Sequence, residues 1–286
     1  MYHLHRSSSL RTVFPGFLLI LSIGLISCAS PARSSSDLDA SDDSLSVDPS
    51  LTIQAPKPMP FDTIDVKYLL GQFDPAKDTN FERIPNQYSG GNARGTYLRK
   101  ETLEAFGRMH AAAKADGVTL TIISSTRNFW RQKAIWEAKW TGARKVGGKN
   151  LSVSTPDPTQ RAKTILLYSS MPGTSRHHWG TDIDINNLTN SYFASGKGLK
   201  EYQWLTAHGH EYGFCQPYTP KGEDRSSGYE EEKWHWSYAP LGKDYLASYQ
   251  ELVNLDMIEG FKGSEAARPL DVISNYVFGI SQRCLD

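Results

Sequence analysis

The sequence lacks an excess of charge of either sign. Its 286 residues contain 31 lysines and arginines and 31 aspartates and glutamates, so the formal net charge is zero. An overall positive field that would point to nucleic acid is therefore absent. We therefore predict no nucleic-acid partner. The chain also lacks internal repeats, which excludes a solenoid, and its length has room for one sizeable domain with appendages.

Long hydrophobic runs are also scarce. One apolar run near the N-terminus, residues 13–26, is too short to span a membrane comfortably. It follows Arg6 and Arg11 and ends in small residues, which is typical of an export signal. An uncleaved N-terminal anchor is the alternative.

The end of this run, Leu25-Ile26-Ser27-Cys28, resembles the signal of bacterial lipoproteins. The resemblance implies that residues 1–27 are a signal peptide and that Cys28 carries lipid. Residues 28–60 are rich in Ser, Asp and Pro and read as a flexible tether. We therefore predict a protein of the bacterial cell envelope, held on a membrane surface by its lipid anchor.

Cysteine is rare, with three in the chain. Lipidation of Cys28 would leave Cys215 and Cys284 in an oxidising compartment, where a disulfide can form. Such a bond would fix the C-terminal tail, residues 256–286, to the domain. Two separate buried thiols are the alternative, because sequence alone cannot place the two sulfurs together.

The chain has no His-Glu-x-x-His motif, which argues against the helix-based zinc proteases. Two other stretches hold metal-binding residue types: one contains His177 and Asp184, and the other contains Glu232 and His235. A catalytic zinc needs three protein ligands and an open position for water. We therefore predict one zinc ion held by His177, Asp184 and His235, with Glu232 as the general base.

The expected local structure supports this set. Alternation at residues 181–185 predicts a strand, on which Asp182 and Asp184 point to the same side. His235 comes from a second predicted strand, residues 233–238, and faces opposite to its two tryptophan neighbours. The remaining histidines that we considered, at positions 110, 178, 208 and 210, are interpreted as packing or hydrogen-bonding residues.

Helical periodicity and end signals define the other expected elements. We predict a strand at 118–124 and helices at 97–115, 199–212 and 241–255. A further helix begins after Asn128, a suitable N-cap, and runs through residue 140.

The pattern Ser175-x-His177-x-x-Gly180-x-x-x-Asp184, followed by Glu232-x-Trp234-His235, resembles the VanY-type zinc D-alanyl-D-alanine carboxypeptidases. These belong with the Hedgehog-like zinc domains. The stretch Ser125-Thr126-Arg127 with Gln132 agrees, and the resemblance covers residues 97–249 in family order.

The resemblance implies an α+β fold with a small antiparallel sheet flanked by helices, in a zinc carboxypeptidase domain over residues 61–255. It implies that Arg127 polarises the scissile carbonyl or holds the terminal carboxylate. Ser125, Gln132 and Ser175 would position the peptide. One departure is Asp182, which stands where the family commonly has a small apolar residue.

The expected activity is removal of a terminal D-alanine from peptidoglycan stem peptides. The same zinc chemistry would also suit an endopeptidase that cuts cross-links or an L,D-carboxypeptidase. A non-catalytic envelope-binding lipoprotein is the remaining alternative. Glu232 argues against it, because a structural zinc site has no need of a base.

Overall fold

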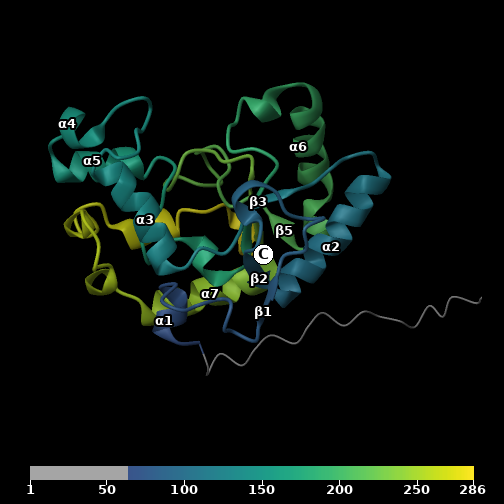
Figure 1. The fold of residues 1–286 in the computed structure, drawn as a ribbon, viewed down its shortest axis with the longest axis horizontal. Coiled ribbons are helices and arrows are strands. Elements are labelled where there is room, and N and C mark those ends of the chain that lie inside the picture. The colour runs from purple at the N-terminus through teal and green to yellow at the C-terminus, as the bar shows by residue number, and fades with distance from the viewer. Residues whose placement is uncertain (1–63) are drawn as a thin grey trace, which may run out of the picture. The chain divides into compact units, whose positions relative to one another are not determined.

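The computed structural model describes residues 64–286, shown in Figure 1. A four-stranded antiparallel sheet has the order β3-β4-β6-β5. Its strands are β3 (Ile122–Ser124), β4 (Asp182–Ile185), β6 (His235–Tyr238) and β5 (Phe214–Cys215). A separate antiparallel pair joins β1 (Phe81–Arg83) to β2 (Tyr97–Arg99).

The pairing of β4 with β6 sets the positions of the polar side chains. Asp184 lies opposite His235, and Asp182 lies opposite Ser237. Because side chains alternate along a strand, these four residues share one face of the sheet. They form a buried polar row in the middle of the protein. A functional site in this region would have to include these side chains or balance their charges.

Helices lie around the strands. In Figure 1, α2 (Lys100–Ala115) and α6 (Gly196–His208) lie on one side, and α3 (Phe129–Trp140), α4 (Leu151–Ser154) and α5 (Pro158–Ile165) lie on the other. Helix α7 (Ala239–Leu252) follows β6 directly and contacts α1 (Val66–Leu69). The short 3₁₀ turns are Gly91–Ala93, Arg176–Trp179, Tyr192–Ala194, Gly209–Tyr212, Leu255–Met257, Ser264–Ala266 and Gln282–Cys284, and a π turn covers Ile273–Val277.

The expected α+β class, with a small antiparallel sheet and flanking helices, is confirmed. Helix α3 begins after Asn128, whose side chain accepts a hydrogen bond from the backbone N–H of Arg131 at 3.0 Å. The prediction of helix over 97–115 was wrong at its start, because residues 97–99 pair with β1 as a strand. The predicted strand at 118–124 is paired in this sheet only at its end.

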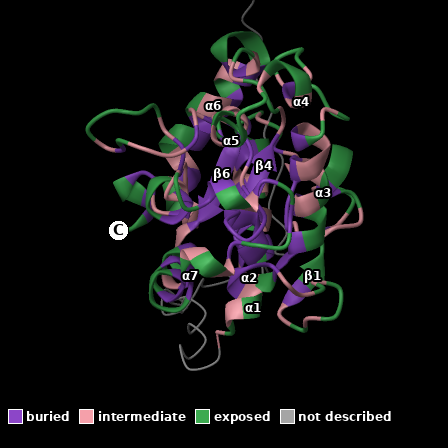
Figure 2. Cartoon of the chain, turned by 90° about the vertical axis from the view of Figure 1, so that its left-hand side faces the viewer, coloured by how far each residue is buried: buried purple, intermediate pink, exposed green. Residues whose placement is uncertain are grey.

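The core surrounds the central strands. Figure 2 shows β4 and β6 as buried, with exposed residues gathered on the outer helices and loops. The segment after residue 255 belongs to the same core, since Val272, Val277 and Ile280 are buried in it. Trp136 of α3 donates its indole N–H to the carbonyl of Lys262 at 2.9 Å. The C-terminal residues are therefore packed against the helices that surround the site.

Among residues 64–286 there is no helix long and apolar enough to cross a membrane. The predicted signal peptide, the tether and Cys28 lie outside the described residues.

A disulfide joins Cys215 of β5 to Cys284 near the C-terminus, with 5.5 Å between the Cα atoms. The two cysteines are separated by 69 positions along the chain. A cross-link that closes a loop of this length removes entropy from the unfolded chain, which stabilises the fold by about 2 to 4 kcal/mol.

We expect reduction of this disulfide to lower the free energy of unfolding by about 2 to 4 kcal/mol. The measurement is urea unfolding with and without a reducing agent. The double variant Cys215→Ser/Cys284→Ser serves as control and should unfold identically under both conditions. Equal unfolding midpoints for oxidised and reduced wild type would contradict the expectation.

Candidate metal centre

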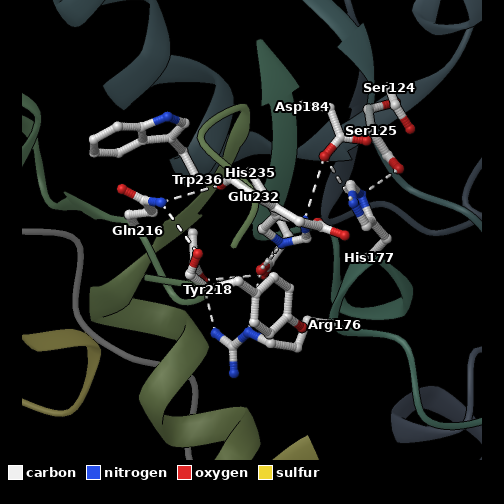
Figure 3. Close-up of polar contacts among 12 residues, drawn as sticks. Ser124, Ser125, Arg176, His177, Asp184, Gln216, Tyr218, Glu232, His235 and Trp236 are labelled. Atoms are coloured by element: carbon white, nitrogen blue, oxygen red, sulfur yellow. Dashed lines mark hydrogen bonds and ion pairs between the residues drawn. The ribbon is translucent and has the colours of Figure 1, made fainter. Parts of the chain in front are cut away.

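Three of the predicted residues converge at the centre of the protein. His177 lies in the 3₁₀ turn before β4, Asp184 lies on β4, and His235 begins β6. One potential ligand atom from each residue lies within 4.8 Å of the other two, and all three residues are buried. Figure 3 shows Asp184 between the two imidazoles. The group therefore has the size of a site for one metal ion.

The turn between His177 and Asp184 depends on Gly180. Its φ of +77° lies in the left-handed region, which favours glycine. A side chain at this position would also collide with the ring of Phe81. Gly180 therefore lets the 3₁₀ turn lead into β4, which brings the two candidate ligand side chains to the same place.

The hydrogen bonds of His177 leave one ring nitrogen free. Its Nδ1 lies 3.0 Å from the carbonyl oxygen of Ser125, which assigns the ring proton to Nδ1. Its Nε2 faces Asp184 Oδ1 at 3.4 Å, and neither atom has a hydrogen-bond partner within residues 64–286. Buried polar atoms are rarely left without partners. Two such atoms facing each other fit a bound cation.

Glu232 lies beside this group. Its Oε2 is 3.3 Å from His235 Nδ1, and Asp184 Oδ1 is also 3.3 Å from that nitrogen. Burial raises the pKa of Glu232, although hydrogen bonding to His235 opposes the rise. A carboxylate with a raised pKa, next to a metal site, is suited to accept and return a proton.

The carboxylates around His235 stabilise positive charge at this place, whether it is carried by a proton on the imidazole or by a bound cation. Burial lowers the pKa of His235, but the neighbouring carboxylates of Asp182, Asp184 and Glu232 outweigh this effect and leave the pKa raised. For His177, burial and the nearby Arg127 lower the pKa to about 4, so its imidazole is neutral at pH 7. A divalent cation binds to neutral imidazole nitrogens and to ionised carboxylates. His177 and the carboxylates around it offer such donor atoms.

Arg127 reaches the site from the end of β3. Its Nη1 donates to Ser124 Oγ at 2.6 Å, its Nε donates to Gln132 Oε1 at 3.1 Å, and its Nη1 lies 3.6 Å from Asp184 Oδ2. Gln132 in turn donates to the carbonyl of Ser170 at 2.8 Å. Gln132 therefore holds the guanidinium in place as well as lining the cavity.

Ser125 and Ser175, which were predicted to position the peptide, differ from each other in their hydrogen bonds. The hydroxyl of Ser125 is 2.6 Å from Thr96 Oγ1, so its contact with the metal group is made by its backbone carbonyl. The hydroxyl of Ser175 is buried and has no hydrogen-bond partner in the described part of the chain. Ser175 nevertheless belongs to the wall of the cavity.

The three candidate ligands, Glu232, Arg127, Gln132 and both serines line one cavity of about 710 Å³, which is large enough for a short peptide end. Its wall also includes Arg131, Lys139 and Arg144, which add positive charge next to Arg127. Burial and the neighbouring arginines lower the pKa of Lys139 to about 8. The cavity thus combines a metal-binding group with cationic side chains that suit a carboxylate.

The sequence interpretation gave two side chains near the site no part in it. Tyr218 packs edge-on against His235, with 4.7 Å between ring centroids, and nothing in the sequence marked it. His178 is a structural residue, as expected, and it also supports the site. Its Nε2 accepts from the N–H of Gly173 at 3.0 Å, and its Nδ1 lies 2.5 Å from the carbonyl of Arg127.

An α+β fold in which two histidines and an aspartate meet in a cavity, with a buried glutamate alongside, is the arrangement of a metallopeptidase. Comparison with known families agrees. The family model described as VanY, D-alanyl-D-alanine carboxypeptidase, matches residues 95–241. The chain belongs to this family, and the predicted resemblance is confirmed.

Two curated relatives carry carboxypeptidase names. YodJ of Bacillus subtilis (strain 168), named as a carboxypeptidase, is 31% identical over 146 residues, covering 50% of this chain and 46% of the relative. A D-alanyl-D-alanine carboxypeptidase of Enterococcus faecalis (strain ATCC 700802 / V583) is 28% identical over 130 residues, covering 46% of this chain and 44% of the relative. The chain thus spans about half the length of the curated relatives it matches.

Among solved structures, VanYB in complex with D-alanine-D-alanine is similar with a TM-score of 0.43 and 23% identity, covering 61% of this chain and 85% of that chain. A VanY variant from a VanB-type resistance cassette, in complex with Zn(II), has a TM-score of 0.41 and 24% identity, covering 60% and 90%. The LD-carboxypeptidase LdcB has a TM-score of 0.44 and 22% identity, covering 73% and 79%.

The position of His178 predicts a dependence of stability on pH. Burial lowers its folded-state pKa to about 3, whereas an unfolded histidine titrates near 6.5. Below pH 6.5 His178 therefore becomes protonated in the unfolded chain but stays neutral in the folded protein. The contribution of His178 to the free energy of unfolding is fully present above pH 6.5 and is lost as the pH falls toward 3. Between pH 7 and pH 5 the loss is about 2 kcal/mol.

The measurement is urea unfolding of wild type and His178→Gln at both pH values, with a chelator present. Glutamine does not titrate in this range, so the pH-dependent loss should be about 2 kcal/mol smaller in the variant. The absolute stability of His178→Gln does not affect the comparison. Equal pH-dependent losses in the two proteins would contradict the assignment.

Proposed function

We propose that this protein is a zinc-dependent D,D-carboxypeptidase that removes terminal D-alanine from peptidoglycan stem peptides. The observation that carries the proposal is the convergence of His177 Nε2, Asp184 Oδ1 and His235 Nδ1, with Glu232 beside them in the cavity. Membership of the VanY family supports both the reaction and the peptide class.

Zinc fits the donor set of two imidazole nitrogens and one carboxylate oxygen. Three protein ligands leave a position open, as in catalytic zinc sites. A zinc ion bound there would polarise the scissile carbonyl and lower the pKa of its water ligand toward about 7.

Glu232 is placed to act as the general base. Its carboxylate lies in the cavity wall, 3.3 Å from His235 Nδ1, close to where the ligand atoms converge. In the proposed reaction it removes a proton from the attacking water and later delivers that proton to the leaving amine. Its burial, which raises the pKa, favours both halves of this transfer.

Arg127 is placed to bind the peptide end. Its guanidinium is held by Ser124 and Gln132 and lies within the cavity wall, so it can present a fixed set of donors. We assign it to the terminal carboxylate of the peptide or to the oxyanion that forms at the scissile carbonyl. Gln132 and Ser175 line the same cavity and would help to position the peptide.

The proposed location is the bacterial cell envelope. Its basis is the lipoprotein-like signal ending at Cys28 and the tether that follows. The envelope is where peptidoglycan is reached, and the family description is consistent with such a substrate. Labelling with a radioactive fatty acid, lost in Cys28→Ser, would test the anchor.

The activity is tested with Glu232→Ala beside wild type and the neighbouring control Glu231→Ala. Wild type and both variants should bind one zinc per chain, because Glu232 is outside the predicted ligand set. Release of one alanine from defined muropeptides should fall by about 10² to 10⁴-fold in Glu232→Ala alone. Zinc content is measured by elemental analysis and cleavage by mass spectrometry.

Each contradictory outcome identifies a different error. Wild type without zinc would overturn the metal assignment, and full activity in Glu232→Ala would overturn the assignment of the base. Cleavage of cross-links, or loss of alanine only from tetrapeptides, would replace the reaction with that of an endopeptidase or an L,D-carboxypeptidase. Zinc and peptide binding without cleavage by wild type would favour a binding protein.

A further inference from the structure

Asp182 contacts His235 on the side of the ring away from the metal-facing atoms. Its Oδ1 lies 2.9 Å from His235 Nε2, and the side chain is fully buried. The other ring nitrogen, Nδ1, faces Asp184 and Glu232. The imidazole is therefore held by carboxylates at both of its nitrogens, and Asp182 is the one that lies behind it.

This contact determines how His235 can bind a metal ion. A carboxylate can only accept, so the hydrogen bond assigns a proton to Nε2 of His235. A neutral ring with its proton on Nε2 presents a lone pair at Nδ1. That lone pair points toward Asp184 Oδ1, and His177 Nε2 lies 3.4 Å from the same oxygen.

Asp182 is itself held by three neighbours besides His235. Its Oδ1 accepts from Arg176 Nε at 3.1 Å. Its Oδ2 accepts from Thr181 Oγ1 at 2.6 Å and from Ser237 Oγ at 3.1 Å. Each oxygen thus has two donors, which leaves the carboxylate little freedom to rotate.

Arg176 is fixed by its own surroundings. Its Nη2 donates to Ser237 Oγ at 2.7 Å, and its guanidinium lies 4.9 Å from the ring centre of Trp179. Helix α7 packs close by, since a Cβ added at Gly242 would lie 3.0 Å from both Arg176 Nη2 and Ser237 Oγ. The guanidinium is therefore closely packed, and it holds the carboxylate of Asp182 in turn.

The charges show what Asp182 contributes. Arg176 forms a buried ion pair with it at 3.1 Å, so the pair adds no net charge next to the site. Asp182 is also absent from the group of converging ligand atoms, which among the described residues contains His177, Asp184 and His235. The role of Asp182 is therefore neither to attract a cation nor to bind it directly. Its contacts are explained by orientation of His235.

We propose that Asp182, held by Arg176, Thr181 and Ser237, is a positioning residue that makes Nδ1 the metal-binding nitrogen of His235. The inference rests on the metal site put forward under the proposed function. Hydrogen-bond partners of this kind orient a metal-binding imidazole, and their loss typically costs about 10- to 100-fold in metal affinity.

The first test uses wild-type protein with ¹⁵N-labelled histidine and one equivalent of zinc. The ring ¹⁵N shifts show which nitrogen binds the metal and which carries the proton. We expect zinc at Nδ1 and a proton at Nε2 for His235. His177 is an internal control with the opposite arrangement, because its Nδ1 bonds to the carbonyl of Ser125.

The second test compares the zinc affinity of Asp182→Ala and Asp182→Asn by competition with a chelator. Alanine removes the acceptor, and affinity should fall about 10- to 100-fold. Asparagine keeps an acceptor oxygen, so its affinity should stay close to that of wild type. Asp256→Ala is the control, because it removes an exposed aspartate that also pairs with an arginine, Arg268.

The outcomes separate this inference from the proposed function. Wild type that binds zinc through His235 Nε2, or Asp182→Ala with wild-type affinity, would overturn the positioning role and leave the metal site intact. An Asp182→Asn variant as weak as Asp182→Ala would also overturn it, because charge would then matter more than orientation. If wild type binds no zinc, both proposals fail. If Asp182→Ala does not fold, zinc at Nε2 of His235 in the wild-type ¹⁵N measurement would still overturn the proposal.

Discussion

The antiparallel pairing of β4 with β6 is the constraint on which the rest of the structure depends. It places Asp184 directly opposite His235 and Asp182 directly opposite Ser237. A shift of one residue would turn these side chains to the other face of the sheet. The tight turn at Gly180 then adds His177 to the group. The candidate ligand group and the hydrogen bonds around it therefore follow from one strand register.

Two arginines balance the buried carboxylates of the site. Arg176 neutralises Asp182 behind His235, and Arg127 approaches Asp184 from the cavity side. Unpaired buried charges would destabilise the fold by several kcal/mol each. This arrangement leaves His177 Nε2 and Asp184 Oδ1 without hydrogen-bond partners within residues 64–286. A bound cation would satisfy both atoms, so stability and metal binding are linked.

Much of this site could be predicted because residue type and spacing carried the chemistry. His177, Asp184 and His235 are recognisable as potential metal ligands, and strand alternation correctly placed Asp182 and Asp184 together. The tertiary contacts could not be predicted in this way. Tyr218 reaches His235 from a distant loop, and Arg176 meets Ser237 only after β6 pairs with β4. The strand at Tyr97–Arg99 was missed because its partner, Phe81–Arg83, determines its conformation.

Crystals soaked in zinc and measured at the zinc absorption edge would test the central claim most directly. The account predicts one anomalous peak about 2.0 to 2.2 Å from His177 Nε2, an oxygen of Asp184 and His235 Nδ1. Glu232 should lie close by without binding the ion. A peak coordinated by other residues, or no peak after soaking, would contradict the metal centre and the proposed function built on it.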